Sequence, residues 1–391
     1  MPGRPPDARG PGAALAAAVL YPFLLTRAGL LLVAWFAAQF APSWTYFDPT
    51  GAARGWSRLP WLALDVWGRY DTAWYLDLAR HGYRPPAELL REQSNLAFFP
   101  LYSWLVRAGT ALLPPAARAG EAGPYLVAVA LANACALLGL ALVYLVVRDA
   151  FSDERLARRT ALYLLLFPAG FFLSCAYTES LYLALAAGTF WLAQRERWAW
   201  AAATGLLLGL TRASGILVAP ALGLLYLSQR GWRLRAVRWD ALAITAAPAG
   251  LLAHAVHLAL LTGDPLALFH AQAAWHRAVA APWRTLLEPA AFHPKMGPLE
   301  LAGAVLFLAL GLALLALRRW ALAAFALLSL APVLLSGTLM SATRFLAVVF
   351  PAFIPLAKAG EREAVDRAVV ILFTFAQALL FFAWSRFYWV A

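Results

Sequence analysis

The sequence has few charged residues. Only 13% of its 391 residues are charged, whereas 63% are hydrophobic, and this balance excludes an ordinary soluble domain. The formal charge is still +12, but the basic residues are spread over short loops instead of forming one face, which argues against a nucleic-acid partner. Lysine is almost absent, because only Lys295 and Lys358 occur among the 32 basic residues.

Several motifs of soluble enzymes are also missing. The two cysteines, Cys135 and Cys175, fall in apolar runs and indicate no disulfide framework. The sequence contains no Gly-rich phosphate loop, so a nucleotide-binding domain is not indicated. His270 and His276 are six positions apart, without a cysteine at a zinc-binding distance. We therefore predict no metal and no other cofactor.

Long apolar runs dominate what is present. Each is long enough to cross a hydrocarbon core of about 30 Å, and a chain inside lipid must satisfy its backbone hydrogen bonds by forming helices. Many of the 17 tryptophans lie at the ends of these runs, as in the aromatic belts of membrane proteins. We therefore predict an all-α integral membrane protein, a single polytopic bundle over residues 1–391 with about 11 membrane segments.

The segment bounds follow from the apolar runs. Nine of the runs are interpreted as single spans: 13–40, 125–147, 160–176, 180–194, 239–261, 298–317, 320–336, 345–357 and 368–384. The stretch 199–227 is long for one helix and carries Arg212 near its middle, which favours two short helices that meet near that arginine. The first run is too long for the apolar core of a signal peptide, although cleavage near Ala37 and Ala38 is the alternative.

Arginine distribution predicts the orientation. The tail 1–12 is expected to be disordered and cytoplasmic. The tail and the short loops on the cytoplasmic side then hold 17 of the 32 basic residues, whereas the short loops on the opposite side hold only Arg344. The C-terminus is then extracytoplasmic, as is a long loop, 41–123, in which interfacial helices are expected at 67–83 and 98–113. The predicted cytoplasmic loops are 148–159, 195–197, 229–238, 318–319 and 358–367.

The stretch 67–83, WGRYDTAWYLDLARHGY, places two acids among aromatic residues. As a helix, it would carry one acid and three apolar residues on one face: Asp71, Trp74, Tyr75 and Leu78. This pattern is typical of a helix that lies on a membrane surface with its aromatic face in the lipid. Asp77 lies almost opposite and is expected to face water or to pair with Arg80 or His81. An acid fixed at the membrane surface, Asp71, is a functional candidate.

Three arginines occur inside or beside apolar runs. Arg212 either binds the phosphate of a lipid, to which a guanidinium is suited, or pairs with Glu179, and the sequence leaves both open. Arg344 lies close to the outer end of a predicted span and is a second candidate for the phosphate, with snorkelling to the interface as the alternative. Arg27 is expected to be structural, either anchoring the first span or pairing within the bundle.

Several stretches together resemble one family. The stretch 67–83, followed by LAFFPLYSWLVR at 96–107, resembles the first-loop signature of the PIG-V-type mannosyltransferases, in the GT-C superfamily of membrane glycosyltransferases. Four further stretches look similar and follow in order: AYTESLYLAL at 176–185, GLTRASGIL at 209–217, GDPLALFHAQAAWHR at 263–277 and ATRFLAVVFPAF at 342–353. Tyr70 and Leu78 are mild departures from the usual Trp and Ile. The resemblance extends over most of the chain.

The resemblance implies an enzyme that moves a hexose, foremost mannose, from a polyprenyl-phosphate donor in the bilayer to an extracytoplasmic hydroxyl of a lipid, glycan or protein acceptor. It assigns the general base to Asp71, which would remove the acceptor's proton while the anomeric carbon is attacked from the opposite face. A solvated acid is the plainer alternative. Arg344 and Arg212 would bind the donor phosphate. Contacts to sugar or acceptor are expected from Trp67, Tyr70, Trp74, Tyr75, Glu179, Gln272, Trp275, His276 and Arg277.

The sequence also allows plainer roles for Glu179 and two other functions for the protein. Glu179 could instead neutralise an arginine or simply favour the start of a helix. A transporter or lipid flippase would also have many membrane helices, but such proteins commonly show paired halves, which this sequence lacks. A scaffold without chemistry would have little use for Arg212. Glycosyl transfer is therefore the first hypothesis.

Overall fold

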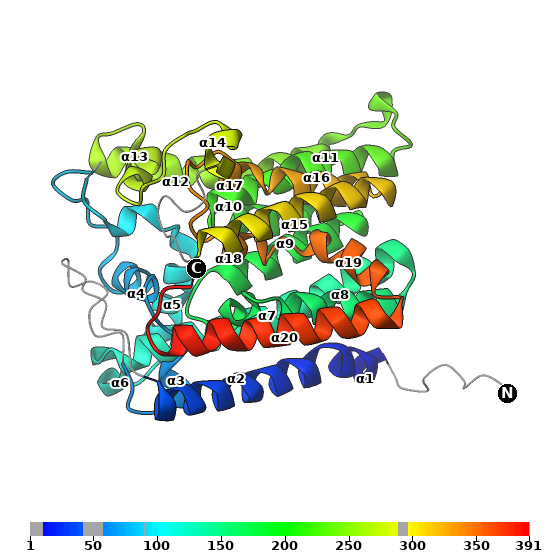
Figure 1. The fold of residues 1–391 in the computed structure, drawn as a ribbon. Coiled ribbons are helices and arrows are strands. Elements are labelled where there is room, and N and C mark those ends of the chain that lie inside the picture. The colour runs from blue at the N-terminus through cyan, green and yellow to red at the C-terminus, as the bar shows by residue number, and fades with distance from the viewer. Residues whose placement is uncertain (1–10, 42–57, 90, 288–295, 391) are drawn as a thin grey trace.

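The computed structural model describes residues 11–41, 58–89, 91–287 and 296–390. Within these ranges the chain forms helices joined by turns and contains no strand, so the predicted all-α class is confirmed (Figure 1). Most of the predicted tail 1–12 lies outside the described residues. Its last two residues already belong to the first helix, which corrects the predicted boundary.

Five helices are long and apolar enough to cross a membrane: Gly12–Phe40, Ala122–Phe151, Trp239–Thr262, Gly297–Ala316 and Glu363–Ser385. At 1.5 Å per residue, 20 residues span about 30 Å. The first comprises α1 (Pro11–Leu15), a π-helical turn and α2 (Tyr21–Phe40). The other four are α7 (Ala122–Phe151), α12 (Ala246–Thr262) with the turn before it, α15 (Gly297–Ala316) and α20 (Glu363–Ser385).

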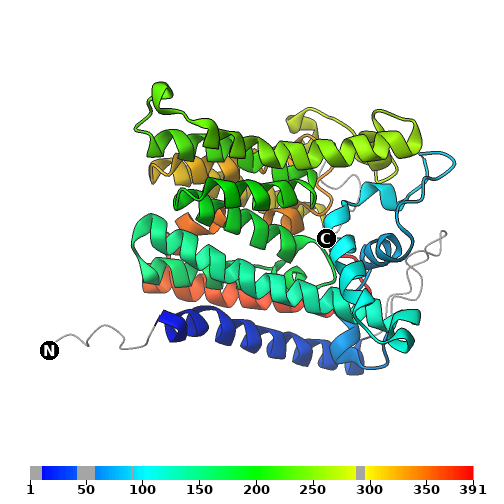
Figure 2. The same ribbon diagram turned by 180° about the vertical axis from the view of Figure 1, so that it is seen from behind.

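Shorter helices fill the space between these five. They are α8 (Glu154–Leu166), α9 (Glu179–Gln194), α10 (Trp198–Gly209), α11 (Val218–Gln229), α16 (Trp320–Leu328), α17 (Ala331–Leu334), α18 (Ala342–Leu346) and α19 (Phe353–Ala359). Figure 2 shows the bundle from behind, with the first helix along one edge and α12 along the opposite edge. Because these helices are short, the count of about 11 membrane segments stays a prediction.

Three predicted spans do not run as single helices: 160–176, 320–336 and 345–357. α8 ends at Leu166 because Pro168 disfavours helical geometry in the preceding residue, and Phe167 accordingly has a ψ of 143°. Pro332 and Pro351 lie at the other two interruptions. A proline cannot donate a backbone hydrogen bond to the preceding turn, so these apolar runs form short helices.

The predicted interruption near Arg212 is confirmed. α10 ends at Gly209 and α11 begins at Val218, with a 3-10 turn at Ala213–Leu217 between them. A Cβ atom on Gly209 would lie 2.1 Å from the carbonyl oxygen of Ala247 in α12. The glycine therefore allows the end of α10 to pack closely against α12.

Gly209→Ala is expected to destabilise the protein, because the added methyl group would collide with the α12 backbone. Overpacking of this kind costs about 1–3 kcal/mol, which would lower the midpoint of thermal unfolding in detergent. Gly223→Ala in α11 is the matched control, since a Cβ atom there meets nothing within 4 Å, and it should not lower the midpoint. Equal midpoints for the two variants would contradict the close packing.

The short arginine-bearing loops gather at one end of the bundle, at the right of Figure 1, which we call the basic end. Contacts between side chains link these loops: Arg195–Asp149 (2.9 Å), Arg230–Glu196 (2.8 Å) and Arg159–Asp366 (3.2 Å). The opposite end, which we call the α4 end, carries six short helices: α3 (Leu62–Asp65), α4 (Thr72–His81), α5 (Pro100–Ala111), α6 (Pro115–Ala119), α13 (Ala267–Ala273) and α14 (Pro282–Leu287).

The predicted helix in the stretch 67–83 is confirmed as α4, but its expected position in the lipid is wrong. Tyr75 and Leu78 are buried by protein, and the Tyr75 ring packs edge-on against Phe98 at 5.0 Å. The predicted pairing of Asp77 with His81 is confirmed by a 2.9 Å contact. The aromatic face of α4 therefore holds the helix against the bundle, and its acid-bearing start is fixed relative to the other helices.

Arg27 pairs within the bundle. It is buried in α2, where Nε donates to the hydroxyl of Ser174 at 2.7 Å and Nη2 donates to the carbonyl of Gly170 at 3.2 Å. These contacts confirm the structural role expected for it. They also tie the first helix to the chain segment that precedes α9.

Candidate functional site

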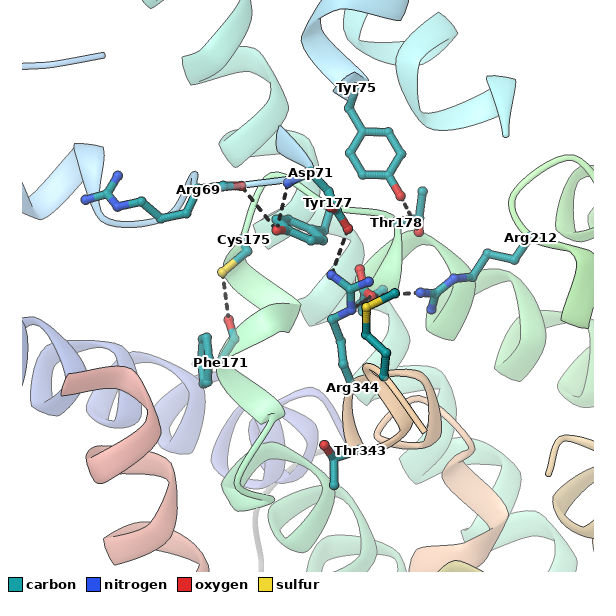
Figure 3. Close-up of polar contacts among 12 residues, drawn as sticks. Arg69, Asp71, Tyr75, Phe171, Cys175, Tyr177, Thr178, Arg212, Thr343 and Arg344 are labelled. Carbon is teal, nitrogen blue, oxygen red and sulfur yellow. Dashed lines mark hydrogen bonds and ion pairs between the residues drawn. The ribbon is translucent and has the colours of Figure 1, made fainter. Parts of the chain in front are cut away.

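The carboxylate of Asp71 and the guanidinium of Arg344 meet at the α4 end. Asp71 is the residue directly before α4, and Arg344 lies in α18. Nη1 of Arg344 donates to Oδ2 of Asp71 at 2.9 Å (Figure 3). The Asp71 side chain is 20% exposed and the Arg344 side chain 7%. The acid can therefore be reached from outside, while the arginine approaches it from within the protein.

The Tyr177 hydroxyl holds the backbone of Asp71 in place. It accepts a hydrogen bond from the Asp71 amide at 3.2 Å and donates one to the carbonyl of Arg69 at 3.1 Å (Figure 3). The amide of Ala176 also donates to the carbonyl of Trp67 at 2.9 Å. The segment before α9 thus clamps the turn that precedes α4, and the position of the Asp71 carboxylate is preorganised.

Glu179 lies at the start of α9 and joins two arginines. Its Oε1 atom accepts from Nη2 of Arg212 at 2.8 Å and lies 3.4 Å from Nε of Arg344. Its side chain is only 1% exposed, and within the described residues Oε2 accepts no hydrogen bond. The contact with Arg212 confirms the pairing that the sequence left open. Because Glu179 is buried, the structure does not support its expected contact with an acceptor.

Three guanidinium groups surround the ring of Phe345. The central carbons lie 4.7 Å from the ring centroid for Arg212, and 4.9 Å for both Arg277 and Arg344. Arg277 also donates to the carbonyl of Met340 at 3.2 Å. With the carboxylates of Asp71 and Glu179, this arginine cluster has one formal positive charge in excess. Arginine forms the strong, directional hydrogen bonds that a phosphate accepts, so the cluster is suited to bind an anion.

The pKa of Arg277 reflects the crowding of positive charge. Burial, and after it the neighbouring Arg344 cation, lower the pKa of this guanidinium to about 10. Arg277 remains protonated at neutral pH, but its cationic form is disfavoured by the neighbouring Arg344 cation. A bound anion would remove this repulsion, so the cluster favours anions electrostatically as well as geometrically.

Glu300 holds Thr343, the residue before Arg344, in place. It is buried near the start of α15, and its Oε2 atom accepts from the backbone amide of Thr343 at 2.6 Å and from its hydroxyl at 2.5 Å. Ser341, just before α18, has a φ of 65°. A residue other than glycine keeps this left-handed conformation only in a turn that its surroundings hold tightly. Glu300 was not among the predicted site residues. The signal available was an acid in the first turn of an apolar span.

Aromatic side chains of α4 and of two loops pack against one another at the α4 end. The Trp74 ring stacks on Phe98 at 6.0 Å and meets Trp275 edge-on at 5.8 Å. Gln272 donates to the carbonyl of Ala97 at 3.0 Å, which fixes α13 to the same loop. Trp74 and Trp275 are half-buried. They offer partly exposed ring surface of the kind on which a sugar ring can pack.

The remaining residues predicted to contact sugar or acceptor are Trp67, Tyr70, Tyr75 and His276. The buried Trp67 ring packs against Phe381 at 5.2 Å, and Tyr70 packs against Trp384 at 5.6 Å and donates from its hydroxyl to the Phe387 carbonyl. The structure therefore gives Trp67, Tyr70 and the buried Tyr75 packing roles and does not support sugar contacts for them. His276 is exposed, in the turn after α13.

No group of three or more His, Cys, Asp and Glu side chains in the described ranges could hold a metal ion. His270 instead pairs with Asp264 at 2.6 Å. That the protein needs no metal stays a prediction.

Sequence comparison identifies the class of protein. The profile described as "Mannosyltransferase (PIG-V)" matches residues 32–253, which is more than half of the chain and includes Asp71, Glu179 and Arg212. The apolar helices mark the chain as a membrane protein. It belongs to the PIG-V mannosyltransferase family, and the resemblance to that family noted in the sequence is confirmed. No curated protein sequence matches the chain at the significance required.

Solved structures with a similar arrangement come from Archaeoglobus fulgidus. One is an oligosaccharyltransferase tethered to an acceptor peptide, with 15% identity and a TM-score of 0.46 over 94% of this chain and 55% of that one. Another is the oligosaccharyltransferase AglB with an inhibitory peptide and a dolichol-phosphate, with 13% identity and a TM-score of 0.45 over 93% of this chain and 55% of that one. This chain spans about half the length of these proteins, and its assignment rests on the family match.

Proposed function

We propose that the protein transfers a hexose, foremost mannose, from a polyprenyl-phosphate donor to an acceptor hydroxyl on the extracytoplasmic side, with Asp71 as the general base. The observation that carries the proposal is the contact between the partly exposed Asp71 carboxylate and the arginine cluster. A base for the acceptor and a binding site for the donor phosphate thus lie side by side. A flippase needs no such base.

The reaction requires a proton acceptor on one side of the anomeric carbon and charge stabilisation on the other. Asp71 takes the proton of the acceptor hydroxyl, whose oxygen bonds to the anomeric carbon. The bond from that carbon to the phosphate oxygen breaks, and its electron pair leaves with polyprenyl phosphate. Attack from the face opposite the leaving group inverts the anomeric centre.

The formal charges of the cluster match each stage of this transfer. A sugar-linked polyprenyl phosphate carries one negative charge, which balances the single excess positive charge of the three arginines and two acids. When Asp71 accepts the proton, the excess becomes two, while the released phosphate monoester approaches two negative charges. The cluster therefore stabilises the products without moving other ions, as preorganised electrostatic catalysis requires.

Arg344 connects the two halves of the reaction. In the structure it binds Asp71 and lies near Glu179. A donor phosphate would compete with Asp71 for this guanidinium, and would free a carboxylate oxygen of Asp71 to accept a hydrogen bond from the acceptor hydroxyl. In this mechanism, donor binding prepares Asp71 for the acceptor.

The proposed orientation rests on the two ends of the bundle. The linked, arginine-bearing loops of the basic end are the kind retained in the cytoplasm. Asp71 lies at the opposite end, and so does the last described segment of the chain, because Tyr70 contacts Phe387. The site would then face outward, the C-terminus would lie on the same side, and the acceptor would be a lipid, glycan or protein of the cell envelope.

A donor assay tests the proposal. Membranes containing the protein should release polyprenyl phosphate from polyprenyl-phosphate-mannose labelled in the sugar, and the label should move to an endogenous acceptor. Polyprenyl-phosphate-glucose should release less, and membranes without the protein none. Movement of intact donor between leaflets without release would instead indicate a flippase. Equal transfer from both donors would contradict the mannose assignment alone.

A further inference from the structure

The loop between α11 and the turn before α12 exposes apolar and basic side chains together. We call residues 231–239, GWRLRAVRW, the Trp–Arg loop; all of them are exposed except the half-buried Ala236. Its apolar side chains and their exposed fractions are Trp232 (54%), Leu234 (75%), Val237 (43%) and Trp239 (87%). The loop stands at the basic end and projects from the edge of the bundle, at the upper right of Figure 1. It lies far from the arginine cluster.

The arginines of this loop differ from others at the basic end. Arg195 and Arg230 pair with acids of neighbouring loops. The side chains of Arg233, Arg235 and Arg238 are exposed, and none has an ion pair or a side-chain hydrogen bond within the described residues. Three cations therefore alternate with four exposed apolar side chains, and the loop contains no acid to balance them.

Hydrogen bonds at the point where the Trp–Arg loop joins the bundle hold the loop in position. The Tyr226 hydroxyl accepts from the backbone amide of Arg238 at 3.0 Å and donates to Asp240 at 2.5 Å. Trp198 packs edge-on against the Tyr226 ring at 4.9 Å, and Arg230 lies 3.4 Å from Asp240. The exposed side chains are thus presented by an anchored loop, which reduces the entropy lost when they bind a partner.

We infer that the Trp–Arg loop binds anionic phospholipid headgroups in the leaflet at the basic end. Tryptophan and aliphatic side chains enter the boundary between headgroups and acyl chains, where aromatic rings are favoured. The arginines then face the headgroup phosphates, and each contributes about fivefold in affinity for an anionic surface. Cations that alternate with interfacial tryptophans match the surface of an anionic lipid leaflet.

The test measures lipid binding to the full-length protein in non-ionic detergent. Native mass spectrometry would count phosphatidylglycerol and phosphatidylcholine molecules retained during titration with each lipid. Arg233→Gln/Arg235→Gln/Arg238→Gln should weaken phosphatidylglycerol binding by roughly 100-fold and leave phosphatidylcholine binding unchanged. Trp232→Ser/Trp239→Ser should weaken the binding of both lipids.

The matched control replaces three arginines at the same end: Arg155→Gln/Arg197→Gln/Arg362→Gln. These residues are exposed, lie outside the Trp–Arg loop and change the net charge equally, so phosphatidylglycerol binding should fall by no more than a few-fold. A loss as large as that of the loop variant would show that net charge alone attracts the lipid, and would overturn the inference. So would equal affinity of the unmodified protein for both lipids, or preferential binding of a polyglutamate peptide by the loop.

Discussion

Asp71→Asn is expected to reduce mannosyl transfer by about 10²–10⁴-fold, the range over which a positioned general base accelerates a reaction. Asparagine has the same shape but cannot take the acceptor's proton. The Tyr177 hydroxyl bonds to the backbone amide of residue 71 rather than to its side chain, so the turn before α4 should persist. The measurement is the rate at which polyprenyl phosphate is released from the labelled donor.

Two controls separate a lost base from a lost structure. Asp77→Asn removes an acid from the same helix, but Asp77 pairs with His81 and not with the arginine cluster, so transfer should remain within a few-fold. Donor binding to Asp71→Asn should be at least as tight as in the unmodified protein, because Arg344 then loses its competing partner. Full activity of Asp71→Asn would contradict the assignment of the base.

Sequence patterns predicted the helices well where the course of a helix depends on residues that are close together in the chain. The interruption near Arg212 could be inferred because a cation in the middle of an apolar stretch needs a partner, and α10 and α11 do separate there. The failures at 160–176, 320–336 and 345–357 have a local cause too. Hydropathy alone defined those spans, although the prolines that interrupt them were visible.

The assembly of the site could not be predicted in the same way. Asp71 and Arg344 are 273 positions apart in the chain, and no periodicity indicates which residues of separate helices will meet. Arg277 was expected to contact sugar because of its loop, yet it joins Arg212 around one phenyl ring. Conversely, Trp67 was chosen for its residue type, and only its burial against α20 reveals a packing role.

Arg344→Gln is expected to produce the second large loss. Arg344 is the one arginine of the cluster that contacts Asp71, and in the proposed mechanism it passes from that carboxylate to the donor phosphate. Loss of a hydrogen bond to a charged group costs about 1.5–3 kcal/mol, so kcat/KM for the donor should fall by about 10–150-fold. Arg344→Lys should recover only part of this loss, because an ammonium keeps the charge but not the paired donors.

The pattern of kinetic constants distinguishes this role from simple support of the fold. If Arg344 binds the phosphate in both ground and transition states, the KM for the donor rises; if it acts on the leaving group, kcat falls as well. Arg107→Gln is the control, since Arg107 is an exposed arginine of α5 at the same end of the bundle. Unchanged KM and kcat in a folded Arg344→Gln variant would mean that the donor phosphate binds elsewhere. The contact between Asp71 and Arg344 would then have no role in the proposed mechanism.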